Sequence, residues 1–434
     1  MNMRRRLLTG AALLTAGALF AGCSSNAPAA PAESAEAATG EITFWSAIKG
    51  MDAVTEAFND SQDDITVNFE EIPNGPGGGY AKIATALASG TAPDVVGIEY
   101  QQLSQFVGGG SLLPIDDLVP AKTLDGYSDQ VRGLVTFNDQ TFAMPYDAAP
   151  LITYYRQDVL NAAGVQVPKT WDEFEAAARA VRASNPTAYI ASYNPNEPAV
   201  VAALAWQAGG EWFGTEGDSW TVGIDDKQTQ KVAEYWQKLV DEDLVKVQPS
   251  FSDAWTADLA SGVTNGVIGA SWSAAGIKSR TEATGQAGEW IAAAPPSWDE
   301  PASAFYGGTS YAITKDSKSP AAAAVFLEFV TTNAAAIEAR GDVGSAYLAY
   351  PGLTDIAKGV FPTEYFGNDI YAAFDESNEV VVDGWAWGPS WDITNTALKD
   401  ALGTVGAGGT IPAAVDTAQT ATVDGLEQLG LSVK

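Results

Sequence analysis

The chain contains no histidine and a single cysteine, Cys23, and these two scarcities restrict its chemistry. Histidine is the side chain that most often acts as a general base or metal ligand near neutral pH, and zinc sites are built mainly from histidine and cysteine. One cysteine cannot form a disulfide bond within the chain. We therefore expect no cofactor and no metal site with nitrogen or sulfur ligands, which leaves open only a cation held by oxygen atoms.

Positive charge is also scarce. The 434 residues include 23 Lys and Arg against 54 Asp and Glu, which gives a formal net charge of −31. So strong an acidic balance repels the phosphates of nucleic acids and of anionic lipid headgroups. The composition therefore argues against a nucleic-acid partner and against peripheral membrane binding, and it favours a neutral ligand.

A long apolar run lies near the N-terminus. Arginines at positions 4–6 precede uncharged residues 7–20, and Ala21, Gly22 and Cys23 follow. The run is too short to span a bilayer, and the layout is that of an export signal. The place of Cys23 behind small residues predicts cleavage before it and lipidation of its thiol, so residues 1–22 are assigned to a lipoprotein signal peptide. A soluble secreted protein is the alternative, and the arginines fit either Sec or twin-arginine export.

Residues 23–40 consist mainly of Ala, Pro, Ser and Glu and carry no large apolar side chain. Such a segment cannot bury enough surface to fold, so it predicts a disordered tether. We expect the protein to sit at the outer face of the cytoplasmic membrane and to touch the membrane only through its lipid anchor.

The rest of the chain is long enough for two domains and begins with a βαβ pattern. Residues 41–45 and 65–72 are typical of strands, and residues 52–59 between them are typical of a helix. The next predicted strand, residues 94–98, is nearly all apolar, as in a buried parallel sheet. Glu99, Tyr100 and Gln101 follow its carboxyl end, where open α/β sheets bind ligands.

Residues 137–174 organise the middle of the chain. Asn138 and the two polar residues after it predict a tight turn between two short strands, and Pro150 directs a strand at 151–155. Thr170 is placed to cap a helix that carries Trp171 and Phe174. We interpret this stretch as a hinge, where the polypeptide leaves one lobe and enters another.

Four segments carry a resemblance to a known family. They are MPYDAAPLITYYRQDVL at 144–160, PKTWDEF at 168–174, ALASGTAPDVV at 86–96 and GGTSYAITKDSKSPAAAAVFLEFV at 307–330. Their order and spacing resemble those of the carbohydrate-binding (family 1, maltose-binding-protein-like) lipoproteins that serve as extracellular solute-binding proteins of bacterial ABC transporters. The resemblance covers most of the chain beyond residue 40.

This resemblance implies an α/β, two-lobed periplasmic-binding-protein-like fold (type II), in which each lobe is a mixed sheet flanked by helices. It implies an N-terminal lobe of residues 41–149 and about 307–350, and a C-terminal lobe of residues 150–306 and about 351–434. A hinge of several crossings joins them, near residues 145–151, 306–308 and 349–353. The implied partners are a neutral mono- or oligosaccharide and the transmembrane subunits of an ABC permease, and the implied state is a monomer.

A sugar-binding cleft needs flat aromatic rings for the C–H faces of the pyranose and short polar groups for its hydroxyls. By resemblance, Trp45, Trp272 and Trp391 fall where cleft residues lie, Asp147 falls beside another such position, and Tyr193 ends a strand that supplies a stacking tyrosine. The predicted ligand-binding residues are Trp45, Ser46, Tyr100, Gln101, Asp147, Tyr193, Asn194, Trp272, Gly308, Trp385, Trp387 and Trp391. For any single one of them, a packed core aromatic or a solvated polar residue is the alternative.

Tryptophans occur in two kinds of context. Trp206 and Trp236 have helical spacing to other apolar residues, which predicts core packing. Trp385, Trp387 and Trp391 instead crowd into a glycine- and proline-containing loop. Because a loop buries little surface, we expect at least one of these three to face a ligand.

Catalytic readings of the sequence are weak. Ser46 and Lys49 have the spacing of a serine–lysine pair and residues 192–194 read Ser-Tyr-Asn, but no Lys-Thr-Gly follows, so the match is by chance. The glycines at 75–79 lack the Gly-Lys-Ser/Thr of a phosphate loop. A glycoside hydrolase stays open, because any two of the many carboxylates could serve as acid and nucleophile. The hinge and tether favour binding without catalysis.

Overall fold

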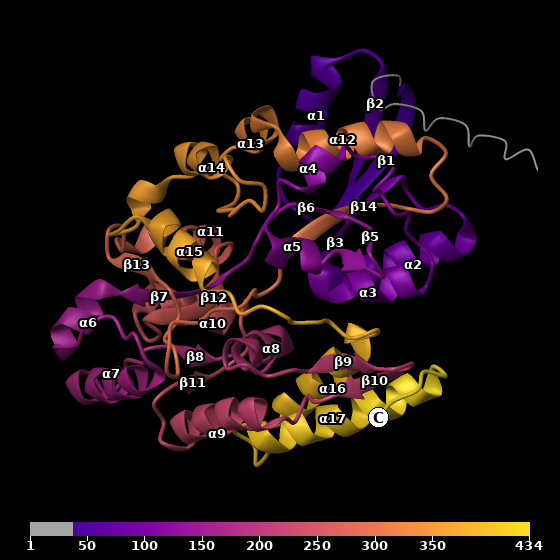
Figure 1. Cartoon of the computed structure of the whole chain (residues 1–434). Helices are drawn as coiled ribbons and strands as arrows, with labels where there is room; N and C mark the ends of the chain where they lie inside the picture. The colour runs from indigo at the N-terminus through magenta and orange to yellow at the C-terminus, as the bar shows by residue number, and fades with distance from the viewer. Residues whose placement is uncertain (1–37) are drawn as a thin grey trace, which may run out of the picture. The chain divides into compact units, whose positions relative to one another are not determined.

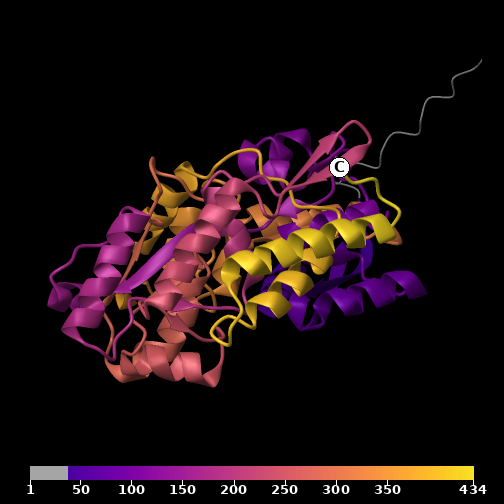
Figure 2. The same ribbon diagram turned by 90° about the horizontal axis from the view of Figure 1, so that it is seen from below.

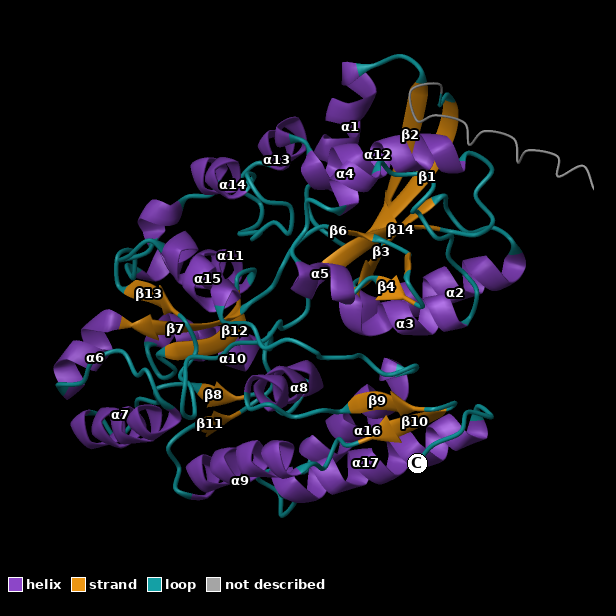
Figure 3. Ribbon diagram, viewed as in Figure 1, coloured by secondary structure: helices purple, strands orange, loops and turns teal. Residues whose placement is uncertain are grey.

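The computed structural model describes residues 38–434 (Figure 1). Cys23, the predicted signal peptide and nearly all of the predicted tether therefore lie outside the described residues. Helices and strands alternate along the described part, as the sequence predicts for an α/β protein (Figure 3).

A five-stranded mixed sheet forms the centre of what we call the N-terminal lobe. The strand order is β2-β1-β3-β14-β6, in which β1 is parallel to β2 and β3, and β14 is antiparallel to β3 and β6. The strands are β1 (Gly40–Ser46), β2 (Ile65–Glu71), β3 (Val95–Glu99), β6 (Met144–Pro145) and β14 (Thr309–Ile313). The helices and the small hairpin of this lobe are α1 (Met51–Ser61), η2 (Gly75–Gly77), α2 (Gly79–Ser89), α3 (Tyr100–Gly108), α4 (Ala121–Leu124), α5 (Asp129–Gly133), β4 (Thr136–Phe137), β5 (Gln140–Thr141), α12 (Pro320–Thr332) and α13 (Ala334–Arg340).

Aromatic packing holds these helices on the sheet. In β1, Phe44 points into the core while its neighbours alternate outward, as the sequence pattern predicts. The Phe44 ring meets Phe326 of α12 at 5.0 Å and Tyr311 of β14 at 5.2 Å, and Phe58 of α1 packs on Phe326 from the other side. The beginning of the chain and residues 311–326 therefore share one core.

The C-terminal lobe is built around β7, which lies between two antiparallel neighbours in the order β12-β7-β13. Its strands are β7 (Leu151–Arg156), β8 (Ser192–Tyr193), β9 (Phe213–Glu216), β10 (Ser219–Val222), β11 (Lys246–Val247), β12 (Gly266–Ala270) and β13 (Trp290–Ala293). Its helices are α6 (Gln157–Ala163), α7 (Trp171–Ser184), α8 (Pro198–Gln207), α9 (Lys227–Asp241), α10 (Asp253–Ser261), α11 (Ser273–Thr281), η3 (Glu282–Thr284), α14 (Thr354–Val360), η4 (Thr363–Tyr365), α15 (Ile370–Glu379), α16 (Trp391–Leu402) and α17 (Ile411–Gln428). Helices α16 and α17 pack against each other and are the two yellow helices of Figure 2.

Three segments cross between the lobes side by side. Ala148 N–H donates to Tyr347 O (2.8 Å), Ala349 N–H donates to Tyr146 O (3.1 Å), and Tyr306 N–H donates to Ala149 O (2.8 Å). The three crossings thus form a narrow ribbon at the places that the sequence predicts for the hinge. Few backbone torsions lie in such a ribbon, so a small change in them can rotate one lobe against the other.

Several local predictions are confirmed. Asn138 and Asp139 take positive φ values of 50° and 60° in the turn between β4 and β5, as a two-residue hairpin of mirror-image type requires. Thr170 caps α7 by accepting a hydrogen bond from Glu173 N–H. Trp206 and Trp236 are buried, as their helical spacing predicts.

Two predicted elements are wrong in extent. The Ala-rich residues 321–339 predict one long helix, but the structure has two, because Asn333 adopts an extended backbone and caps α13 by accepting from Ala335 N–H. The sequence also predicts a strand over residues 189–193, but only β8 forms, and Tyr189 makes an isolated bridge to Thr264. Within residues 38–434 no single helix has the length and apolar composition to cross a membrane, and α12 and α13 meet that test only as a pair bent by 69°.

Candidate functional site

A cleft of about 610 Å³ lies where the two lobes and the crossings meet. This volume falls in the range of about 300–1,000 Å³ that is usual for small-molecule sites. The N-terminal lobe contributes residues after β1 and at the end of β3, and the C-terminal lobe contributes residues after β8, after β12 and at the start of α16. Most of these positions are strand ends, which is where the alternation of strands and helices leaves side chains free to meet a ligand.

The sheet topology explains why the N-terminal wall comes together. Strand β14 runs antiparallel to β3, so its first residue, Thr309, pairs with Glu99 at the end of β3. Gly308 has φ +97°, and a Cβ at this position would stand 2.5 Å from the ring of Tyr100. Only glycine allows this close approach. Tyr100 is buried there, and its hydroxyl donates to Asp147 O (2.8 Å), so it positions the wall from behind.

Three carboxylates surround the cleft. Oε2 of Glu99 accepts hydrogen bonds from the Tyr80 hydroxyl (2.6 Å) and from Gln101 Nε2 (2.9 Å), and burial raises the pKa of Glu99. Asp147 Oδ1 accepts from Thr309 N–H (2.6 Å), and burial raises the pKa of Asp147 to about 6. Glu197 accepts from the Tyr306 hydroxyl (2.8 Å) and the Ser250 hydroxyl (2.5 Å).

Each of these carboxylates keeps acceptor capacity for a ligand, because a carboxylate offers about four lone-pair positions. Arg340, at the end of α13, supplies donors on the same side of the cleft. Its guanidinium lies 5.7 Å from the ring centre of Tyr146, and its Nε donates to Lys49 O (3.1 Å). Acceptors and donors are therefore both available to hydroxyl groups.

The C-terminal wall is aromatic. Trp272 follows β12, its indole N–H donates to Tyr306 O (3.1 Å), and the two rings are 5.2 Å apart. The ring of Phe251 lies 6.4 Å from that of Trp272. Because the indole N–H is already bonded, Trp272 offers the cleft its ring surface, which suits a C–H face.

Only some of the predicted residues meet in the cleft. Those that line it are Gln101, Asp147, Trp272, Gly308 and Trp391. Ser46 is buried and lines a side pocket of about 160 Å³ that also includes Glu99. Trp45 is half-buried beneath the ammonium of Lys82, 4.5 Å from its ring centre, and does not line the cleft.

Tyr193 and Asn194 lie deeper in the C-terminal lobe. Tyr193 is buried against Trp236, with 6.0 Å between the ring centres, and lines a small pocket within the lobe. Asn194 lines that pocket and a second one next to the cleft, and its amide donates to Gln248 O. In this structure both stand behind the cleft wall.

Trp385 and Trp387 do not line the cleft and pack against other aromatic rings, which corrects the reasoning that loop tryptophans are poorly explained by packing. Trp385 stacks on Trp206 of α8, with 5.2 Å between ring centres and 7° between planes. Trp387 is buried and meets the edge of Trp391 at 5.1 Å. Trp391 belongs to the same cluster, is 4% exposed and reaches the cleft at its margin.

The structure also adds residues that the prediction lacks. They are Lys49, Asn196, Glu197, Phe251, Tyr306 and Arg340. Glu99, which the sequence places at a strand end, also lines the cleft, and Glu197 follows the end of β8 by four residues, so position could have indicated it too. Arg340 ends a helix and carries no local signal, because its role depends on where α13 packs. Among residues 38–434 no group of three or more Asp, Glu, Cys or His side chains could hold a metal ion.

Comparisons with known proteins agree with this geometry. Residues 45–337 match the family model described as bacterial extracellular solute-binding protein. The chain is 26% identical to the lactose-binding protein of Rhizobium radiobacter over 368 residues, 80% of each chain. It is 28% identical to the maltodextrin-binding protein of Bacillus subtilis over 345 residues, 76% of this chain and 78% of that protein.

Solved structures are similar over nearly the whole chain. An ABC-transporter-associated binding protein from B. animalis subsp. lactis, in complex with β-1,6-galactobiose, superposes with a TM-score of 0.78 at 25% identity, covering 91% of this chain and 100% of that one. The galacto-N-biose- and lacto-N-biose-binding protein of Bifidobacterium longum superposes with a TM-score of 0.79 at 24% identity, covering 92% and 99%. The fold is therefore two-lobed.

Proposed function

The chain belongs to the family of bacterial extracellular solute-binding proteins, and on that basis we propose that it captures a neutral mono- or oligosaccharide between its lobes. It then presents the sugar to the transmembrane subunits of an ABC importer. The work is a difference in affinity between an open and a closed arrangement of the lobes, and no covalent step takes part.

One observation carries this proposal, namely the pairing of two unlike walls in one cleft. Glu99 and Asp147 offer oxygen acceptors on one side, while Trp272 offers a ring surface on the other. A pyranose has hydroxyls around its rim and an apolar face, so it satisfies both walls at once. The relatives named for lactose and maltodextrin support a sugar over other solutes.

Isothermal titration over a panel of neutral mono- and disaccharides tests the proposal. Saturable binding of at least one sugar, with stoichiometry of one, is expected. Failure of every sugar in the panel to bind or to raise the melting temperature would contradict it. Incubation with chromogenic glycosides tests the absence of catalysis, and turnover that depends on Asp147 or Glu99 would favour a glycoside hydrolase.

We also propose that Cys23 carries a lipid and holds the protein at the outer face of the membrane as a monomer. The support is the position of Cys23 behind an apolar run and small residues. Cys23→Ser should move the protein from the membrane fraction to the soluble fraction. A variant that stays with the membrane would contradict the anchor and leave the sugar proposal intact.

A further inference from the structure

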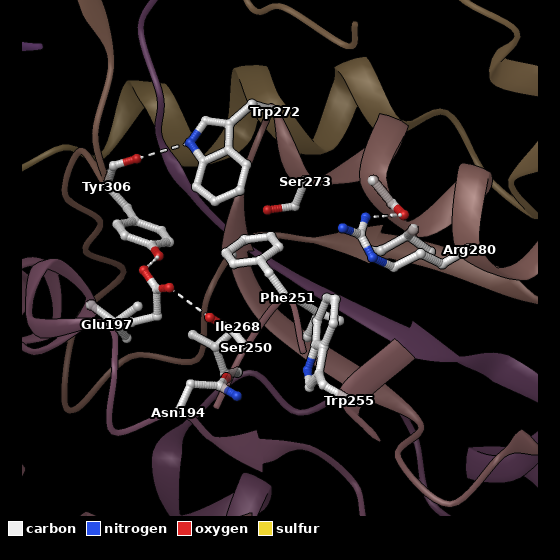
Figure 4. A pocket seen from close by; sticks show the side chains of 15 residues that line it. Asn194, Glu197, Ser250, Phe251, Trp255, Ile268, Trp272, Ser273, Arg280 and Tyr306 are labelled. Atoms are coloured by element: carbon white, nitrogen blue, oxygen red, sulfur yellow. Dashed lines mark hydrogen bonds between the residues drawn. The ribbon is translucent and has the colours of Figure 1, made fainter. Parts of the chain in front are cut away.

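A second, smaller pocket opens beside the cleft in the C-terminal lobe (Figure 4). It has a volume of about 70 Å³. Glu197, Phe251, Trp272 and Tyr306 line both this pocket and the cleft, so the two spaces are neighbours with a shared wall. Its inner surface is formed largely by apolar side chains, among them Val267 and Ile268 of β12. We call it the aromatic pocket.

Phe251 stands at the mouth of the aromatic pocket in an unusual conformation. Its backbone has φ +59°, which is rare for a bulky residue, and Phe251 is 52% exposed. The loop is pinned on both sides, because Ser250 N–H donates to Asn196 Oδ1 (2.8 Å) and Ser252 caps α10 by accepting from Trp255 N–H. An exposed aromatic ring that is held in strained backbone indicates a functional contact rather than a packing requirement.

Arg280 supplies a hydrogen-bond donor to the same pocket. Its guanidinium carbon lies 5.5 Å from the ring centre of Phe251 and 5.3 Å from that of Trp255. Nη1 donates to Gly276 O (2.8 Å), and among residues 38–434 no carboxylate acts on the charge of Arg280. Burial lowers its pKa, as for a cation that has lost water without gaining an anion. Within the part of the chain that the structure describes, its other N–H groups have no protein acceptor, so they are available to a ligand.

Size decides which kind of group the pocket can hold. A volume of about 70 Å³ is roughly half of the 150 Å³ that accommodates benzene in an engineered cavity. A sugar ring is therefore too large, and a group of a few heavy atoms fits. The group that fits this pocket has an apolar part that packs against Val267 and Ile268 and a hydrogen-bond acceptor that faces Arg280.

We propose that the aromatic pocket is the subsite for the acetamido group of an N-acetylated sugar whose ring lies against Trp272. The acetyl methyl group fills the apolar interior, and its carbonyl oxygen accepts from Arg280. This inference rests on the proposed sugar-binding function and specifies one substituent of the ligand. A hydroxyl group in the same place leaves the interior empty and Arg280 without an acceptor.

Matched pairs of β-linked disaccharides, which differ only by acetamido against hydroxyl at one carbon, test the subsite by calorimetry. We expect the wild-type protein to bind the acetamido member of a pair about 10-fold more tightly or better, the discrimination usual for a small group in a fitted pocket. Val267→Met, which fills the interior, and Arg280→Met, which removes the donor, should reduce the preference below about 3-fold.

Phe251→Gly provides a variant that is safe for folding, because glycine adopts positive φ without strain. It should keep or raise the melting temperature of the free protein and lose the acetamido preference. Equal affinity for the two members of every pair in the wild-type protein, while other neutral sugars bind, would overturn the subsite and leave the proposed function standing. A preference that survives Val267→Met and Arg280→Met would also overturn it. Binding of no sugar at all would overturn the proposed function and the subsite together.

Discussion

The two walls of the cleft differ in how they affect the stability of the folded protein. On the N-terminal wall, Glu99 and Asp147 are held as carboxylates in a buried setting that raises the pKa of both, so their charged forms are disfavoured in the folded state. On the C-terminal wall, Trp272 and Tyr306 lie against each other with the Trp272 indole N–H bonded. The buried carboxylates of the N-terminal wall therefore lower the stability of the folded protein while they provide acceptors for a ligand. The aromatic wall provides a contact surface for the ligand with little loss of stability.

This difference predicts opposite responses to mutation. Removing a charge from the N-terminal wall should stabilise the protein and weaken binding. Removing a ring from the aromatic wall should weaken binding and leave stability nearly unchanged. A tryptophan outside both walls provides the reference for what loss of packing alone does.

Trp387 is that reference and should show the largest change. It is 8% exposed and packs on Trp385 and Trp391 at 5.4 and 5.1 Å. Trp387→Ala should lower the free energy of unfolding by about 3–5 kcal/mol, because it leaves a cavity in a packed cluster. Urea denaturation measures this cost. Sugar affinity, measured by titration below the melting range, should stay within about 2-fold of wild type, and a larger loss would place Trp387 in the site.

Asp147→Asn should stabilise the free protein in a pH-dependent manner. The pKa of Asp147 is about 6 in the folded protein against about 3.9 when unfolded. The folded state thus binds the proton more tightly, and the contribution of Asp147 to stability falls as pH rises from about 4 through 6. Asparagine does not titrate and keeps an acceptor for Thr309 N–H. The variant should therefore gain about 2–3 kcal/mol over wild type at pH 7 and almost nothing at pH 4.

Denaturation of both proteins at the two pH values measures that gain, and titration at pH 7 should show weaker sugar binding. A stability difference that is the same at pH 4 and pH 7 would contradict the conclusion that the buried charge of Asp147 destabilises the folded protein.

The smallest expected effect concerns the contact between the lobes. Gln102 Nε2 of α3 donates to Asp392 Oδ1 of α16 (2.6 Å). If this bond favours the closed arrangement, Asp392→Ala should weaken sugar binding by about 0.5–1.5 kcal/mol, or roughly 2- to 12-fold. Asp400→Ala, at an exposed site farther along the same helix, is the matched control. Equal affinities of the two variants would show that the hydrogen bond between Gln102 and Asp392 does not favour the closed arrangement.

Much of the fold could be predicted because its signals are local. The turn at Asn138 and the cap at Thr170 depend on residues within four positions, and the fold class followed from the resemblance of four segments. The break at Asn333 was missed, because an Ala-rich sequence on both sides favours one continuous helix. In the structure α12 and α13 meet at a bend of 69°, and Asn333 caps α13 at that bend.

The candidate site was harder to predict, because it depends on contacts between distant segments. Trp385 was expected near a ligand on account of its loop, but its partner Trp206 lies on α8, far away in the sequence. Arg340 reaches the cleft only because α13 packs on α1. The end of β3 was an informative position, since Glu99 and Gln101, which lie at or just after it, line the cleft, while Asp147, which the resemblance implied, lines it as well.

The most direct test of the account is paired calorimetry on Trp272→Ala, with Trp387→Ala as the reference. If Trp272 stacks on the sugar, its removal should weaken binding by about 1–3 kcal/mol, roughly 5- to 150-fold. The melting temperature of the unliganded variant should stay close to wild type, in contrast to Trp387→Ala. Unchanged affinity together with a melting temperature lowered as far as in Trp387→Ala would assign Trp272 to the core and contradict the site.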